Sequence, residues 1–356
     1  MKILTVVGAR PQFIKAGVVS RKLRKNAHEI IVHTGQHYDS NMSDVFFREL
    51  EIPTPDYNLN ISGGSHASMT GRMLIELEKV MLEEKPDKVL VYGDTNSTLA
   101  AALAATKIHI PVAHVEAGAR LGTLSNPEEV NRILTDHMST HLMACTESAL
   151  DFLEKEGLMD RTTLVGDPMY DAFCYYSKRL TSNVFENIVD LYGKSVSISD
   201  DFYYLTCHRQ ENTEKEETLI SILDAMEQLD APTYYPVHPR NQKVVKYIIQ
   251  NKNYQNIKFI IPVGYSTSIA FVKNAKRIVT DSGGVQREAF FAQKPCVTVF
   301  DYVVWPETMK GNWNQLSKPD TNEIINKLKT TPDPLHNYQP FGDGNSAEKI
   351  IDVLLS

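Results

Sequence analysis

The chain has 356 residues, more than one ordinary hydrophobic core organises, so two or perhaps three domains are expected. Hydrophobic residues make up 42% of it, and a net charge of −7 argues against a broad nucleic-acid surface. No apolar run is long enough to span a bilayer, so no membrane partner is expected. The four cysteines lie in apolar stretches and lack metal-ligand spacing: Cys145, Cys174, Cys207 and Cys296. They are therefore predicted to be buried, reduced thiols, which indicates a cytoplasmic location.

Residues 1–177 alternate short β-rich runs with amphipathic helices. Strands are predicted at 2–8, 29–35, 88–94, 112–118, 141–146 and 162–166, and helices at 69–84 and 147–157. The strand runs are apolar throughout instead of alternating, which indicates burial on both faces of a parallel sheet. The pattern therefore predicts an N-terminal α/β domain.

The alternation of strands and helices ends at residues 178–200, a polar and turn-rich passage that we interpret as an interdomain connection. Further strands at 202–207, 233–238, 257–263, 277–282 and 295–300 predict a second α/β domain over residues 201–340. A last helix in 341–356 begins at a serine suited to capping and is expected to pack back on the first domain. Two doubly wound domains in tandem place their ligand at the carboxyl ends of the strands, in a central cleft.

The stretch DSGGVQREAF at 281–290 ends a predicted strand and begins a helix. Ser282, Gly283 and Gly284 bring backbone N–H groups to the helix N-terminus, where the dipole favours an anion. Glu288, expected to be exposed one turn further, can accept hydrogen bonds from both hydroxyls of a ribose. We interpret this as a nucleotide site, against the alternative of a helix cap followed by a surface glutamate.

Cationic and imidazole groups stand at other predicted strand ends. Arg10 and Lys15 in GARPQFIK suit a diphosphate, although a capped helix with solvated charges gives the same pattern. His208 and Arg209 in LTCHRQEN, and His238 in YPVHPRN, favour anion binding or acid–base work. Metal binding is disfavoured, because the Asp, Glu and His residues show no short ligand spacing.

The segment PEEVNR at 127–132 has the composition of a favourable helix start. Neighbouring helical residues point about 100° apart, so Glu128 and Glu129 cannot both face a ligand squarely. Glu128 and Arg132 are four apart and can pair. Without further information, this motif is interpreted as a helix start.

Taken together, the motifs resemble one known family. GARPQFIK, TGQH, GDTNSTLA, HVEAGAR, PEEVNRILTD, CHRQEN, PVHPR, DSGGVQREA and FGDG occur in family order over nearly the whole chain. The set is similar to the non-hydrolysing UDP-N-acetylglucosamine 2-epimerases of bacteria and archaea, near a branch that includes UDP-2,3-diacetamido-glucuronate 2-epimerases. The resemblance implies two Rossmann-like domains of the glycosyltransferase-B type, a homodimer, and inversion at C2 of a UDP-linked N-acetylhexosamine.

By that resemblance, the domain 1–177 holds the sugar and the catalytic acids, and the domain 201–340 binds UDP. The matching positions imply a catalytic role for Asp94, Glu116, Glu128 and His208. They imply substrate binding by Arg10, Lys15, Arg209, His238, Ser282, Gly283, Gly284 and Glu288. Glu129 is left as a structural partner. Elimination of UDP and its re-addition requires no metal and no cofactor.

Three departures from the family pattern bear on substrate and regulation. The loop between Arg120 and Pro127 is shorter than in many members. The segment 38–44 lacks the glutamines of an activating UDP-GlcNAc site, although Arg72 remains. Trp305 replaces an arginine, so UDP-GlcNAc ranks first as the expected substrate, for cell-surface polysaccharide precursors. Alternatives are a UDP-2,3-diacetamido-glucuronate 2-epimerase, a glycosyltransferase of the same fold, a hydrolysing epimerase and a silent nucleotide-sugar sensor.

Overall fold

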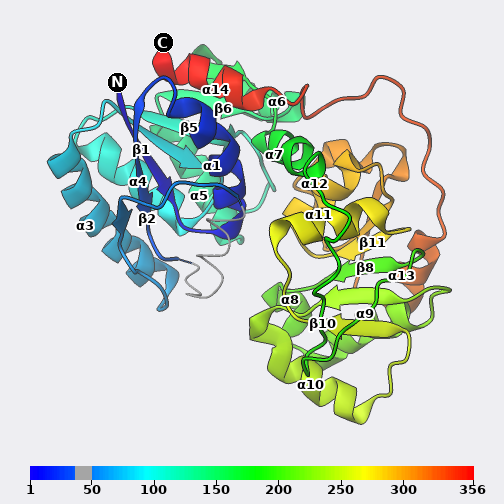
Figure 1. Cartoon of the computed structure of the whole chain (residues 1–356). Coiled ribbons are helices and arrows are strands. Elements are labelled where there is room, and N and C mark those ends of the chain that lie inside the picture. The colour runs from blue at the N-terminus through cyan, green and yellow to red at the C-terminus, as the bar shows by residue number, and fades with distance from the viewer. Residues whose placement is uncertain (37–49) are drawn as a thin grey trace. The chain divides into compact units, whose positions relative to one another are not determined.

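The computed structural model describes residues 1–36 and 50–356 and divides the chain into two compact units (Figure 1). Unit 1 comprises Met1–Cys174 and Gln339–Ser356, and unit 2 comprises Tyr175–Tyr338. Each unit is built on one parallel sheet with helices packed on it. The predicted α/β class with two doubly wound domains is therefore confirmed. In the described part of the chain, none of the helices combines the length and the apolar character needed to cross a membrane.

The sheet of unit 1 has seven strands in the order β3–β2–β1–β4–β5–β6–β7. They are β1 (Lys2–Val7), β2 (His28–His33), β3 (Tyr57–Asn58), β4 (Lys88–Tyr92), β5 (Val112–Ala117), β6 (His141–Ala144) and β7 (Thr162–Leu164). The sequence analysis missed β3, because two residues are too short to leave a period. β1 pairs in parallel with both β2 and β4, so the strand order reverses beside β1. Ligands of open α/β sheets bind beyond the carboxyl ends of strands at such a point.

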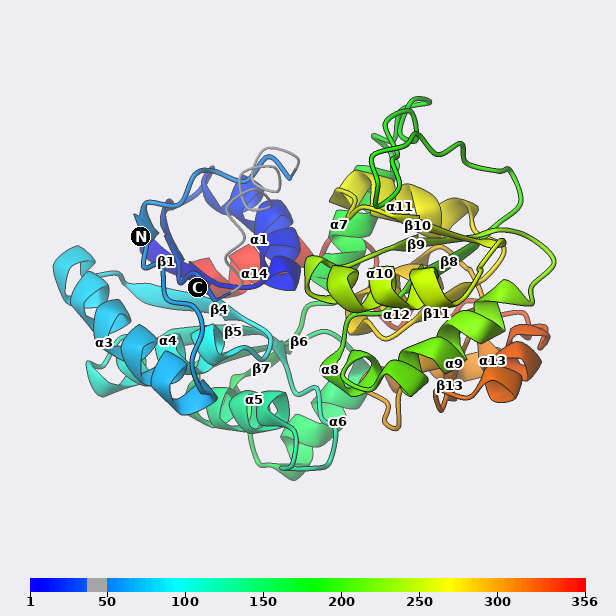
Figure 2. The same ribbon diagram turned by 90° about the horizontal axis from the view of Figure 1, so that it is seen from below.

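Helices cover both faces of this sheet. They are α1 (Arg10–Leu23), α3 (His66–Glu84), α4 (Asn96–Lys107), α5 (Pro127–Met138), α6 (Glu147–Lys155), α7 (Pro168–Ser177) and α14 (Ser346–Leu355), with a 3-10 turn η1 (Met159–Arg161). Figure 2 shows α1 and α14 on one face, with α3, α4 and α5 on the other. Unit 1 thus takes its last helix from the C-terminus of the chain, where an ion pair of 2.7 Å joins Lys22 of α1 to Glu348 of α14.

The start of α14 corrects one expectation. Ser346 does not cap this helix, because it is the first helical residue and Asn345 stands at the cap position without a side-chain bond. Instead, the backbone amides of Ser346 and Ala347 donate to the buried carboxylate of Asp171 on α7, at 3.1 and 2.8 Å. The free N–H groups at the start of α14 are therefore satisfied by a carboxylate far away in sequence, and not by the local serine that the sequence suggested.

Unit 2 has a six-stranded sheet in the order β10–β9–β8–β11–β12–β13. Its strands are β8 (Tyr203–Thr206), β9 (Thr233–Pro236), β10 (Ile257–Ile260), β11 (Ile278–Thr280), β12 (Cys296–Val299) and β13 (Asn314–Ser317). β13, with the sequence NQLS, was not predicted, because its residues are mostly polar. The buried side chain of Asn314 is accommodated by accepting a hydrogen bond of 2.7 Å from Thr298 on β12.

The helices of unit 2 are α8 (Gln210–Thr213), α9 (Glu216–Glu227), α10 (Gln242–Asn251), α11 (Tyr265–Asn274), α12 (Gly283–Phe291) and α13 (Thr321–Leu328). Two 3-10 segments, η2 (Pro239–Asn241) and η3 (Pro306–Asn312), follow β9 and β12. Residues 178–200, predicted to connect the domains, belong to unit 2 and touch its sheet through a bridge between Asp190 and Ile260. The predicted domain bounds and the roles given to each domain stay predictions.

Candidate active site

The carboxyl ends of β4 and β5 meet a buried lysine in unit 1. Lys15, on α1, forms an ion pair with Glu116 on β5, and their side chains are 3% and 9% exposed. Gly93 follows β4, and a Cβ atom added there would stand 3.5 Å from the Lys15 ammonium nitrogen. The lysine therefore lies against both strand ends, directly beside the residue that precedes Asp94.

The backbone of Glu116 is held in an uncommon conformation. Its φ angle is +74°, and the pairing of β5 with β6 shifts register between Val115 and Ala117. A non-glycine residue in the left-handed region costs on the order of 1 kcal/mol or more and persists only where its surroundings over-determine it. Such residues cluster at functional sites, and this one was predicted to be catalytic.

Asp94 follows Gly93 and keeps 27% of its side chain exposed. Its carboxylate pairs with the guanidinium of Arg132 on α5, and its carbonyl accepts a 2.9 Å hydrogen bond from the side chain of Asn131. Two consecutive residues of one helix thus fix the loop that carries this acid. The guanidinium of Arg132 thus places a positive charge directly against this acid.

The two glutamates at the start of α5 have different environments. Glu129 is buried and accepts hydrogen bonds from the amides of Leu121 and Gly122, at 2.7 and 2.9 Å. It also pairs at 3.1 Å with Arg132, the residue with which the spacing allowed Glu128 to pair. The inward-facing glutamate takes the arginine, and Glu128 is exposed in the first turn of the helix.

A glutamine that the sequence analysis did not single out ties two loops together. The side-chain oxygen of Gln12 accepts from the amides of Gly8 and Ala9, at 2.7 and 3.0 Å, and its nitrogen donates to the carbonyl of Tyr92 at 2.7 Å. These contacts lock the loop after β1 to the end of β4. Arg10, the first residue of α1, is half-buried and starts from this locked loop.

In unit 2, Asp281 organises the residues after β8. Its buried carboxylate accepts from the amide of His208 at 2.9 Å and from the amide of Arg209 at 2.8 Å. The Nδ1 atom of His208 lies 3.2 Å from the same carboxylate. The imidazole is therefore oriented by an acid at the end of β11, which the sequence analysis quoted only as part of a motif.

Two further predicted residues of unit 2 have defined neighbours. The rings of His208 and His238 stack with their centroids 6.0 Å apart, and His238 Nδ1 accepts from the amide of Arg240 at 3.3 Å. The guanidinium of Arg209 lies 4.1 Å from the ring centre of Phe300 and donates to the hydroxyl of Tyr302. The strand ends thus hold two imidazoles and one guanidinium in fixed orientations.

The first turn of α12 is capped by Ser282, as in the alternative that was set against the nucleotide site. The Ser282 side chain accepts from the amide of Val285 at 3.3 Å. A Cβ atom at Gly283 would stand 3.9 Å from Trp305 Nε1, and one at Gly284 would stand 3.6 Å from Ser282 Oγ. Both are ordinary contact distances, so packing does not require glycine at these positions. Close approach of a ligand to the backbone gives a physical reason for the two glycines.

The exposure expected for Glu288 was wrong, because its side chain is buried at 3% exposure. Glu288 lies on α12, which packs against α11 and η3. Trp305 is also buried, and the guanidinium of Arg287 lies 4.1 Å from its ring centre. The indole that replaces the family arginine is therefore packed beside the first turn of α12.

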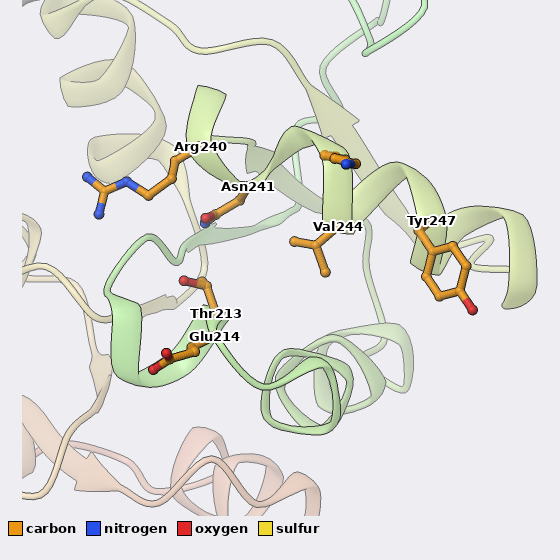
Figure 3. A pocket seen from close by; sticks show the side chains of 7 residues that line it. Thr213, Glu214, Arg240, Asn241, Val244 and Tyr247 are labelled. Atoms are coloured by element: carbon orange, nitrogen blue, oxygen red, sulfur yellow. The ribbon is translucent and has the colours of Figure 1, made fainter.

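A separate pocket of about 700 Å³ lies on unit 2 (Figure 3). It is lined by Thr213, Glu214, Arg240, Asn241, Lys243, Val244 and Tyr247. None of the residues predicted to catalyse or to bind UDP lines it. His37 and the segment 38–44 lie outside the described residues. Within residues 1–36 and 50–356, no group of three His, Cys, Asp or Glu side chains is placed to hold a metal ion.

The chain belongs to an isomerase family. The model of the family described as UDP-N-acetylglucosamine 2-epimerase matches residues 21–355, so the chain is a member of that family and the predicted resemblance is confirmed. It is 48% identical to a UDP-N-acetylglucosamine 2-epimerase homolog of Methanococcus maripaludis, over 99% of each chain. It is 44% identical to the UDP-2,3-diacetamido-2,3-dideoxy-D-glucuronate 2-epimerase of Pseudomonas aeruginosa, again over 99% of each.

Solved structures agree with this assignment. The UDP-GlcNAc 2-epimerase of Methanocaldococcus jannaschii, in complex with UDP-GlcNAc and UDP, superposes with a TM-score of 0.90 at 41% identity. The match covers 100% of this chain and 99% of that one. The UDP-GlcNAc 2-epimerase of Neisseria meningitidis, bound to UDP-GlcNAc, gives a TM-score of 0.88 at 30% identity over the full length of both chains.

Proposed function

We propose that the enzyme inverts C2 of a UDP-linked N-acetylhexosamine and interconverts UDP-GlcNAc with UDP-ManNAc. The observation that carries the proposal is the buried Lys15–Glu116 pair beside the loop of Asp94, with Glu116 in a strained conformation. Family membership and the names of the relatives support the same reaction.

The chemistry explains why acids are needed near C2. The hydrogen at C2 of an N-acetylhexosamine is not acidic, because no carbonyl group is attached to that carbon. UDP therefore leaves C1 with the electrons of the C1–O bond, a carboxylate removes the C2 proton, and a 2-acetamidoglucal forms. A diphosphate oxygen of UDP then adds back to C1 while C2 is protonated on the opposite face. We assign the proton transfers to the carboxylates of Asp94, Glu116 and Glu128.

The departing diphosphate needs positive charge and N–H donors. We assign this role to Arg10, Lys15, Arg209 and His208, with His208 also counted among the catalytic groups. The amides at Ser282, Gly283 and Gly284 supply donors at a capped helix N-terminus. Glu288 is assigned to the ribose and His238 to UDP. The held orientations of His208 and His238 support these assignments.

A second candidate substrate is the UDP-2,3-diacetamido-glucuronate on which the Pseudomonas relative is named to act. Its uronate carboxylate requires a cation. Arg120 is already engaged by the carboxylates of Asp136 and Glu156, both at 2.7 Å, so it is a poor candidate. Arg240 is exposed and lines the pocket in Figure 3, and it is the better candidate.

A panel of UDP-sugars incubated in D2O and followed by proton NMR tests the proposal. We expect deuterium at C2 of UDP-GlcNAc and the appearance of UDP-ManNAc. A glycosyltransferase would incorporate no deuterium, a hydrolysing epimerase would release UDP and free N-acetylmannosamine, and a sensor would bind without turnover. Exchange with the uronate alone would select the second candidate. Asp94→Asn, Glu116→Gln and Glu128→Gln should each lower exchange by roughly a hundredfold or more.

We further propose that the enzyme works as a cytoplasmic homodimer without a cofactor and supplies precursors of cell-surface polysaccharides. Light scattering of the purified protein tests the dimer, since the expected mass is twice the 40.1 kDa of one chain. Full turnover after exhaustive dialysis against a chelator would support the absence of a cofactor.

A further inference from the structure

A completely buried histidine connects the two backbone segments that carry Asp94 and Glu116. His114 lies on β5, two residues before Glu116, and its side chain has no exposed surface. Its Nδ1 atom lies 2.6 Å from a carboxylate oxygen of Asp136 on α5. Its Nε2 atom lies 2.7 Å from the carbonyl oxygen of Gly93, at the end of β4. Both nitrogens of one ring thus face oxygen atoms.

The second oxygen of Asp136 continues the network. It accepts a 3.0 Å hydrogen bond from the amide of Gly118 and pairs with Arg120 at 2.7 Å. Burial acts to raise the pKa of Asp136, but the charges and hydrogen bonds of His114, Arg120 and Gly118 outweigh it and lower the pKa. Independently of the histidine, a guanidinium and a backbone amide both donate to one oxygen of Asp136, which favours the carboxylate, and a carboxylate accepts hydrogen bonds and donates none.

The charge of the ring follows from its two partners. A carbonyl oxygen has no proton to donate, so Nε2 must carry the proton in the contact with Gly93. The Asp136 carboxylate also has none, so Nδ1 must carry a proton as well. An imidazole with both nitrogens protonated is an imidazolium cation. The charges alternate in sign along the network, from the His114 cation to the Asp136 anion, the Arg120 cation and the Glu156 anion. The buried positive charge of His114 is therefore balanced by neighbouring negative charge.

The contacts of this cation end on backbone groups beside the proposed catalytic acids. Gly93 has a φ of +62°, lies beside the Lys15 ammonium and precedes Asp94, so its carbonyl direction fixes the peptide unit leading to that acid. Gly118 has a φ of +83° and follows Glu116 by two residues. One imidazolium, acting with Asp136, therefore holds both backbone segments in register.

We propose that His114 is a buried imidazolium that positions Asp94 and Glu116 for proton transfer at C2, through the Gly93 carbonyl and the Asp136–Gly118 contact. The proposal rests on the proposed function for the roles of the two acids, but the charge of the ring does not. His114 touches no reacting atom in this scheme and is a positioning residue. Its effect is expected mainly on the chemical step, because its contacts end on the backbone beside the two acids, whereas the ribose contact and the amide donors for UDP are assigned to unit 2.

The charge is tested first, on the unaltered enzyme labelled with ring-15N histidine. At about pH 8, where exposed histidines are neutral, the His114 nitrogens should both show directly bonded protons and similar 15N shifts. The His114→Gln variant assigns these signals by their loss. One protonated and one bare nitrogen in the ring would overturn the proposal.

The positioning role is tested with His114→Gln and Asp136→Asn, which remove the cation and its counter-charge. We expect kcat for C2 deuterium exchange to fall about a hundredfold, as for a displaced catalytic group, with the Kd for UDP changed less than about twofold. His137→Gln is the matched control. His137 lies on α5 next to Asp136, but within this network its side chain contacts only Glu156, the member farthest from His114.

Two kinetic outcomes contradict the positioning role. The first is an unchanged kcat in both variants. The second is a loss of UDP affinity as large as the loss of kcat, which would show general damage to the fold. Absence of C2 exchange in the unaltered enzyme would instead refute the proposed function. The NMR measurement would still decide the charge of His114 in that case, so the two failures are distinguishable.

Discussion

The ammonium group of Lys15 and the carboxylate of Glu116 form an ion pair from which water is almost excluded. Neither charge keeps much contact with solvent, so their pairing offsets part of the cost of burying both. The sequence predicted Lys15 to bind a diphosphate, and the structure also pairs it with the carboxylate of Glu116, whose backbone has a positive φ. A lysine that faces both a carboxylate and the departing phosphate would couple proton removal to the loss of UDP.

Breaking this pair should be costly. Lys15→Met leaves a buried carboxylate without its cation, and we expect the free energy of unfolding to fall by about 3–5 kcal/mol. Glu116→Gln should have a comparable effect. The double variant should be less destabilised than the sum of the two, since it leaves no isolated charge. Urea unfolding of the four proteins measures this, and strict additivity would show that the pair contributes no coupling.

Glu128 and Glu129 should differ in what their loss affects. Glu129→Gln weakens the contacts to Arg132 and to the amides of Leu121 and Gly122, so we expect a loss of about 1–3 kcal/mol in stability. Glu128→Gln changes an exposed side chain and should leave stability within about 0.5 kcal/mol while lowering C2 exchange. Thermal melts and exchange rates measured side by side decide this. An inactive Glu129→Gln of full stability would reverse the assignment.

Glu288 is expected to contribute both to UDP binding and to folding. Glu288→Gln keeps the shape of the side chain and should weaken UDP binding by on the order of 1–3 kcal/mol, through altered contacts to the ribose. Because the residue is buried, Glu288→Ala should in addition lower the melting temperature. Calorimetric titration with UDP tests the assignment, with the exposed Glu217→Gln as control. Unchanged affinity in Glu288→Gln would count against the ribose contact.

His33 should make the stability of the fold depend on pH. Its ring stacks on Phe13 and its Nδ1 accepts a 2.7 Å hydrogen bond from the amide of Gly35, so the ring is neutral there. Burial lowers the pKa of His33 to about 4 from an ordinary 6.5. Between these two pKa values the His33 side chain is protonated in the unfolded chain and neutral in the folded chain. Stability should therefore be complete above pH 6.5 and decline toward pH 4, by on the order of 3 kcal/mol.

The control for this effect is His33→Asn. An asparagine can accept from the amide two residues on, but it does not titrate. Urea midpoints at several pH values between 7.5 and 4 should fall less steeply in this variant. Parallel declines in both proteins would assign the acid sensitivity to other groups.

The enzyme should run in both directions without UDP-GlcNAc as an activator. Segment 38–44 lacks the glutamines of the activating site, and Arg72 donates to the carbonyls of Ser62 and Gly63, at 3.2 and 2.6 Å. UDP-ManNAc alone should give UDP-GlcNAc without delay, and Arg72→Ala should leave this initial rate unchanged. A lag that trace UDP-GlcNAc abolishes would show that an activating site is present.

Much of the fold and several features of the site could be predicted from the sequence, because their causes are local. Continuous apolar runs indicated strands buried on both faces, and the structure has parallel sheets at those runs. Ser282 was predicted to start a helix, and its side chain caps α12. The 100° step between helical residues predicted that Glu128 and Glu129 face different ways. Each of these features depends on residues within about one helical turn.

The rest was decided by partners that lie far apart in the chain. Asp171 caps α14 from 175 residues away, which no local pattern announces. Glu288 was expected to be exposed, but it is buried on a helix that packs against α11 and η3. His114 and Asp136 are 22 residues apart, and β5 and α5 must pack before their charges meet. Sequence spacing sets which face of an element a side chain occupies, whereas the packing of elements sets what that face meets and whether its charge is compensated.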